Sequence, residues 1–193
     1  MKTDHYRLIS IDPGSRNMGL AFTEVNLLTR EITVVEAETV VVDLFLRLHE
    51  GEYSFGEIIE RQLIISGVLK STCERVEPHA FVAEDFYLAG NATAYRSLAE
   101  CMLTAKNAVL QYNNNVKFLL YTASNIKKKI GVSGTSGDKA AVKEAVLKLN
   151  NLSISSDIDT DALDQHAWDA IAVGYCGALE ILEQTKDIIS RTV

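Results

Sequence analysis

The first forty residues carry two apolar runs joined by a sharp turn. Residues 6–11 are rich in Leu and Ile, as in a buried strand, and Pro13-Gly14 then combines a fixed φ with a permissive residue. After the turn, apolar residues resume at every second position: Met18, Leu20 and Phe22. This pattern predicts an antiparallel hairpin with Asp12 at its mouth, and the Thr, Val and Ile content of residues 31–42 predicts a third strand.

Helix and strand patterns alternate through the rest of the chain. Two long segments have apolar residues at helical spacing: residues 55–73 and 92–111. Two short apolar runs predict a fourth and a fifth strand: residues 80–83 and 116–121. Two or three short helical pieces follow, and residues 164–185 predict a closing helix. We therefore expect one α/β domain over residues 1–193, with a five-stranded mixed sheet whose first three strands are antiparallel.

Composition narrows the class of protein. With 193 residues and 47% hydrophobic content, the chain can form one well-buried core. No apolar run approaches the roughly 18 residues that cross a membrane, and the first residues lack the apolar core of a signal peptide, so we expect a cytoplasmic protein with no membrane partner. The three cysteines are far apart and form no Cys-x-x-Cys pair, which predicts buried free thiols.

Charge is distributed unevenly along the chain. The net charge is −7, which argues against a polyanionic partner, because non-specific nucleic-acid binding depends on Lys and Arg at the phosphates. Residues 115–150, however, hold seven lysines and only two carboxylates. This segment fits a surface directed at an anion, and a solvated helix face would account for many of the same lysines.

Carboxylates stand at the ends of predicted strands. Asp12 and Glu84 each follow an apolar strand, at the edge where α/β sheets usually hold ligands. Asp169 and His166 share one face of the closing helix, which is otherwise small and apolar. Such a set could hold two Mg²⁺ ions roughly 4 Å apart, as in phosphoryl transfer. Taken singly, Asp12 could instead be a turn former, and Glu84 and Asp169 could be surface or ion-paired carboxylates.

Four motifs follow one another along the chain. They are Ile-Asp-Pro-Gly-Ser-Arg at residues 11–16 followed by Gly19, a strand ending in Glu84 before Asn91-Ala92, a basic block at 121–127 and 134–142, and Asp-Ala-Ile-Ala at 169–172. In this order they resemble the motifs of the RuvC family of Holliday-junction resolvases. The resemblance implies a ribonuclease-H-like fold with helices flanking the sheet, in a bacterial or infected host cell. It also implies a homodimer that resolves four-way DNA junctions by symmetric nicking.

The same resemblance assigns roles to residues. It implies that Asp12, Glu84 and Asp169 are catalytic carboxylates that bind two Mg²⁺ ions, for which Mn²⁺ is expected to substitute, with no small-molecule cofactor. His166 would be the fourth member of the site, either as a metal ligand or as the group that orients or deprotonates water. Two carboxylates are fallback candidates for the position of His166: Asp164 and Asp161.

A further set of residues would contact the DNA. The resemblance implies that Tyr87 stacks on bases at the junction centre. It also implies that Lys127, Lys128 and Lys139 hold phosphates. The acidic net charge and a second helix that carries Ala99-Glu100-Cys101, without the family's basic residue, leave alternatives open. These are a nuclease for a wider set of branched or flapped DNA, another ribonuclease-H-like enzyme, and a junction-binding protein without turnover.

Overall fold

The computed structural model describes residues 4–48, 56–85, 92–132 and 140–190, and side chains as far as residue 186. Its centre is a six-stranded sheet in the order β5-β4-β1-β2-β3-β6. The strands are β1 (His5–Asp12), β2 (Asn17–Asn26), β3 (Ile32–Val41), β4 (Ala80–Asp85), β5 (Lys117–Thr122) and β6 (Leu152–Ile154). The first three are antiparallel, as predicted, whereas β4 and β5 extend the sheet in parallel from β1.

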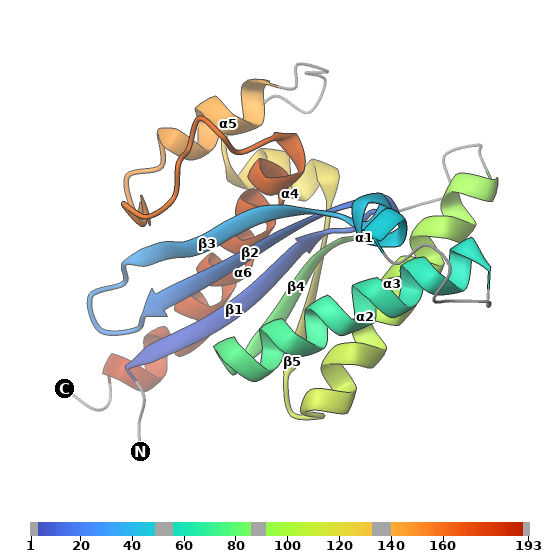
Figure 1. The fold of residues 1–193 in the computed structure, drawn as a ribbon. Coiled ribbons are helices and arrows are strands. Elements are labelled where there is room, and N and C mark those ends of the chain that lie inside the picture. Colours follow the sequence, from blue (N-terminus) through green and yellow to red (C-terminus); the bar gives the residue numbers. More distant parts are fainter. Residues whose placement is uncertain (1–3, 49–55, 86–91, 133–139, 191–193) are drawn as a thin grey trace.

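Helices cover both faces of this sheet (Figure 1). They are α1 (Val42–Leu48), α2 (Glu57–Val76), α3 (Ala92–Tyr112), α4 (Ala123–Lys129), α5 (Ala140–Leu147) and α6 (Gln165–Ser190). In Figure 1, α2 and α3 lie side by side on the near face, and α6 crosses the far face with α4 and α5 above it. The mixed α/β architecture predicted from the sequence is therefore correct.

Two elements differ from the sequence prediction. The predicted five-stranded sheet has a sixth strand, because Leu152–Ile154 pairs in parallel with the edge strand β3. Three residues are too few to produce a recognisable alternation. The second element is the short helix α1, which was not predicted and begins at Val42 directly after β3. The Val42 amide donates to the Arg16 carbonyl at 2.8 Å.

Alternate residues of each strand supply two separate cores. On β1, Leu8 packs toward α6, whereas Ile9 and Ile11 pack toward α2 and α3. On β4, Val82 follows Leu8, and Phe81 follows Ile9. Successive side chains of a strand point to opposite faces, so this division fixes the face of every later residue on the same strand.

The α6 helix lies very close to the sheet. A Cβ atom added to Gly174 would lie 2.6 Å from the Ser10 Oγ and 3.1 Å from the Thr23 Oγ1. The buried Ser10 hydroxyl donates to the Ala170 carbonyl at 2.8 Å, so strand and helix are also joined by a hydrogen bond. The small residues of this helix therefore set its distance from the strands.

Replacing Gly174 by Ala should destabilise the protein by about 1–2 kcal/mol, because the added methyl group displaces the Ser10 hydroxyl. Urea unfolding would measure this loss. Gly67→Ala is the matched control, since Gly67 lies in α2 with nothing within 4 Å of an added Cβ. That change should stabilise the protein by about 0.5–1 kcal/mol. A loss as large at Gly67, or none at Gly174, would contradict the close packing of α6.

Candidate active site

Asp12 and Glu84 both face α6. Asp12 continues the series Leu8 and Ser10 on β1, and Glu84 continues the series Ala80 and Val82 on β4. The two strands are parallel neighbours with Ile11 opposite Ala83, so the carboxylates occupy the next position on each strand. The same alternation points Asp85 toward the opposite face. The sequence prediction of Glu84 at the strand end therefore agrees with the register of the sheet.

His166 brings α6 to the end of β1. Its Nδ1 lies 2.7 Å from the Asp12 Oδ2, and the Asp12 side chain is only 18% exposed. The helix can come this close because residue 19 on β2 is glycine: a Cβ there would lie 2.0 Å from the His166 carbonyl oxygen. Gly19 was not predicted to be part of the site, and its only signal in the sequence is its place at the end of the first motif.

Asp169 lies one turn further along α6 and shares the same electrostatic environment. The Gln165 Nε2 donates to its Oδ2 at 3.4 Å. Burial, with repulsion from Asp12, raises the pKa of Asp169 to about 6. Burial, with repulsion from Asp12 and Asp169, raises the pKa of Glu84 to about 7. The four predicted residues thus come together, since Asp12 interacts with each of the other three.

Asp12 itself is a buried acid held by a histidine. Burial raises the pKa of the Asp12 carboxyl, and the hydrogen bond and charge of His166 oppose that rise. The corner of the fold where β1, β4 and α6 meet therefore carries more acidic groups than its own cations neutralise. Lys127 of α4 is the cation that lowers the pKa of both Glu84 and Asp169.

The two fallback carboxylates have other partners. Asp164 precedes α6 and accepts a hydrogen bond from the Ala167 amide at 3.1 Å and another from the Thr39 hydroxyl of β3. Burial acts to raise the pKa of Asp164, but these hydrogen bonds outweigh it and hold the pKa below its usual value. Asp161 forms an ion pair with Lys143 at 3.2 Å. His166, rather than either aspartate, contacts Asp12.

The predicted DNA-binding residues fall into two groups. Lys127 and Lys128 both lie on α4. Lys127 is close enough to Glu84 to lower its pKa, and Lys128 is exposed at the surface. Tyr87 and Lys139 lie outside the described residues. Other lysines of the basic segment have partners within the protein: Lys117 contacts Gln184, Lys129 lies 4.8 Å from the Tyr121 ring centroid, Lys143 pairs with Asp161, and Lys148 pairs with Glu144.

The chemistry of this donor set fits a divalent cation. Carboxylate oxygens are the ligands that Mg²⁺ prefers. Burial raises the pKa of Asp12, Glu84 and Asp169, so a cation beside them would favour their ionised forms. As arranged, the part of the chain that the structure describes contains no group of three or more His, Cys, Asp or Glu residues that could hold a metal ion.

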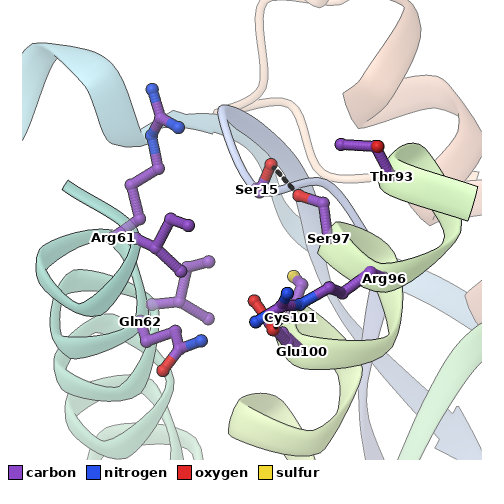
Figure 2. A pocket seen from close by; sticks show the side chains of 10 residues that line it. Ser15, Arg61, Gln62, Thr93, Arg96, Ser97, Glu100 and Cys101 are labelled. Atoms are coloured by element: carbon purple, nitrogen blue, oxygen red, sulfur yellow. Dashed lines mark hydrogen bonds and ion pairs between the residues drawn. The ribbon is translucent and has the colours of Figure 1, made fainter.

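A pocket of about 240 Å³ lies between α2 and α3, away from the carboxylates. Figure 2 shows Ser15, from the turn after Asp12, facing Ser97 of α3, and their hydroxyls are 2.8 Å apart. Cys101 lines the same pocket, and its Sγ lies 3.6 Å from the Gly14 carbonyl. These contacts fix the turn that carries Asp12, so we assign this pocket no chemistry.

The family described as crossover junction endodeoxyribonuclease RuvC matches residues 8–177. The chain belongs to the RuvC family. As a member of this family it is a crossover junction endodeoxyribonuclease. A search of curated protein sequences finds no match. The described helices include none that is long and apolar enough to cross a membrane.

Solved structures support the family fold at low sequence identity. The Thermus thermophilus RuvC structure in complex with a Holliday junction substrate has a TM-score of 0.62 and 16% identity, over 87% of this chain and 89% of that one. The yeast mitochondrial Holliday junction resolvase has a TM-score of 0.65 and 11% identity, over 97% and 85%. The fowlpox virus Holliday junction resolvase has a TM-score of 0.57 and 12% identity, over 90% and 99%. These likenesses confirm the predicted ribonuclease-H-like fold.

The raised acid pKa values predict how the metal-free RuvC-family protein responds to pH. Glu84 and Asp169 bind protons more tightly when folded, so their contribution to stability is complete below their ordinary pKa values and is lost as pH rises through about 6 to 7. In EDTA, the free energy of unfolding should therefore fall between about pH 5 and 8. Glu84→Gln should flatten this profile and add about 1–2 kcal/mol at pH 8.

Urea unfolding at several pH values would measure the profile. Asp157→Asn is the matched control, because Asp157 is an exposed carboxylate. That variant should keep the wild-type slope. A Glu84→Gln profile as steep as that of the wild type would contradict the assignment of Glu84 to a buried acidic cluster.

Proposed function

We propose that this protein is a Mg²⁺-dependent endonuclease that resolves Holliday junctions by symmetric nicks in two strands. The observation that carries the proposal is the meeting of Asp12, Glu84 and Asp169 at one corner of the fold, where burial raises the pKa of each and repulsion from Asp12 adds to the rise at Glu84 and Asp169. Family membership supports junction DNA as the substrate. The Thermus thermophilus relative was solved with a Holliday junction substrate, which supports the same assignment.

Each residue of the site has a distinct proposed role. Asp12, Glu84 and Asp169 would hold two Mg²⁺ ions, which supply Lewis-acid activation of water and stabilise the leaving oxygen. His166 lies beside Asp12 and is 41% exposed, so its ring can orient the attacking water or accept its proton. Lys127 already lies in the field of Glu84 and Asp169 and would meet the phosphate.

The pairing of lysines favours a second candidate with broader selectivity. Four lysines of the basic segment already contact other groups of the protein, as described above, and the net charge is −7. These four lysines are then less available to follow the DNA backbone of a full junction. A nuclease that cuts branched or flapped DNA more widely would use the same acidic site.

Exposed apolar side chains on α2 and α3 support a homodimer. They are Ile58, Ile59 and Leu63 on α2 and Leu103 on α3, each between 47% and 60% exposed. These side chains lie on two helices that pack side by side, and exposed apolar residues on adjoining helices are typical of an interaction surface. A second copy of this chain is the occupant we propose, because two symmetric nicks require two active sites related by a two-fold axis.

Asp12→Asn should reduce cleavage of a four-way junction at least about 100-fold, since it removes the charge at the centre of the site. A labelled synthetic junction, a flapped duplex and a linear duplex, each with Mg²⁺ or EDTA, would provide the measurement. Ligatable symmetric nicks in the junction alone support resolution, and equal cutting of the flap supports the second candidate.

Asp157→Asn is the control for this assay, because it removes an exposed carboxylate without touching the cluster. It should cleave at the wild-type rate. Unchanged activity in Asp12→Asn, or equal cutting of linear duplex, would refute the proposed function.

Leu103→Glu combined with Ile59→Glu should convert a dimer to a monomer, since each change buries a carboxylate in the proposed apolar interface. Sedimentation velocity would measure the mass. Leu28→Glu is the matched control, because Leu28 is 56% exposed in the turn between β2 and β3. A monomeric wild type, or a variant that remains dimeric, would contradict this interface.

A further inference from the structure

Three residues form a row across the first three strands. Asp12 on β1 pairs with Gly19 on β2, and Gly19 pairs with Thr39 on β3. Residues opposite one another in antiparallel strands point to the same face, so Asp12 and Thr39 both point toward α6. Thr39 is part of no motif, and only this register relates it to the carboxylates.

The beginning of α6 rests on this row at three points. His166 contacts Asp12 at 2.7 Å through its ring, and its carbonyl packs directly over Gly19. At the third point, the Thr39 hydroxyl donates to the Asp164 carboxylate, which also caps the helix through the Ala167 amide at 3.1 Å. The backbone carbonyl of Asp164 accepts the Trp168 amide at 3.2 Å.

These contacts restrict how α6 can turn about its own axis. Deeper in the sheet the Ser10–Ala170 hydrogen bond and the buried face of α6 already limit its rotation. A shift of the first turn would still move His166, and Asp169 with it, away from Asp12, because they lie three residues apart on one face. The Thr39–Asp164 bond lies at the far end of the row from the His166–Asp12 contact. Contacts on two different strands therefore fix the first turn of α6.

We propose that Thr39 and Asp164 are positioning residues that hold α6 in the rotation at which His166 and Asp169 meet Asp12. This inference deepens the proposed function and rests on it. Asp164 acts through its two hydrogen bonds and is not itself a ligand of the metal ions. We call the Thr39–Asp164 hydrogen bond the strand–helix clasp.

The clasp predicts a change in metal-free protein. Thr39→Val keeps the shape of the side chain and removes the hydroxyl donor. Hydrogen exchange at the Ala167 and Trp168 amides should then become at least about fivefold faster, because the first turn of α6 opens more readily. Thr39→Ser restores the donor and should restore slow exchange.

The clasp also predicts a change in metal binding. Isothermal titration with Mn²⁺ should give a dissociation constant about 10-fold weaker for Thr39→Val, as is typical when support for metal ligands is lost. Asp164→Asn keeps both acceptor bonds and should stay within about threefold of the wild type. Asp164→Ala should resemble Thr39→Val.

Thr33→Val is the matched control. Thr33 lies on the same strand, and its hydroxyl forms an equivalent hydrogen bond with the Ser153 hydroxyl at 3.0 Å, away from α6. Neither exchange in α6 nor Mn²⁺ affinity should change. Equal effects at Thr33 and Thr39 would overturn the proposal, as would a loss of Mn²⁺ binding in Asp164→Asn as large as that in Asp12→Asn, which would make Asp164 a ligand.

The two measurements separate this inference from the proposed function. Unchanged exchange in Thr39→Val, beside a wild type that binds Mn²⁺ and cleaves junctions, overturns the clasp alone. Faster exchange in Thr39→Val with a wild type that binds no Mn²⁺ refutes the metal-dependent function, and with it the role given to the clasp.

Discussion

The close contact between α6 and the central strands is the constraint on which the site depends. Asp12 and His166 are separated by 154 positions in sequence, yet their side chains lie 2.7 Å apart. That distance is possible only because Gly19 has no Cβ to meet the helix backbone, and because Gly174 allows the same approach one layer deeper. With a larger side chain at either position, α6 would lie further from the strands and His166 could not reach Asp12.

Electrostatics acts against this arrangement in the metal-free protein. Burial raises the pKa of Asp12, Glu84 and Asp169, and the three carboxylates repel one another. A fold selected for stability alone would replace such groups with apolar residues. Either a proton at low pH or a bound cation relieves this repulsion, and the cation alone leaves the carboxylates ionised. A site that destabilises the protein in this way is consistent with selection for function.

Much of the candidate site could be predicted from the sequence, because two of its carboxylates follow buried strands directly. Buried runs on β1 and β4 end abruptly in Asp12 and Glu84, and a carboxylate after an apolar run is a strong signal. The three-residue strand β6 and the contribution of Thr39 were missed because neither has a local pattern. Thr39 acquires its role only from the register of β3 against β2 and from the cap of α6, which are tertiary facts.

Charge connects the site to its substrate. Some lysines of residues 115–150 already contact other groups of the protein: Lys143 pairs with Asp161 at the surface and lies 5.5 Å from the Trp168 ring centroid. Fewer phosphate contacts mean fewer released counterions and therefore a shallower dependence of affinity on salt. A protein with this charge distribution would select DNA more by the shape of the branch than by total electrostatic attraction. In the proposed homodimer, the second copy would then matter as much for affinity as for placing a second nick, because its site binds with the advantage of a linked first contact.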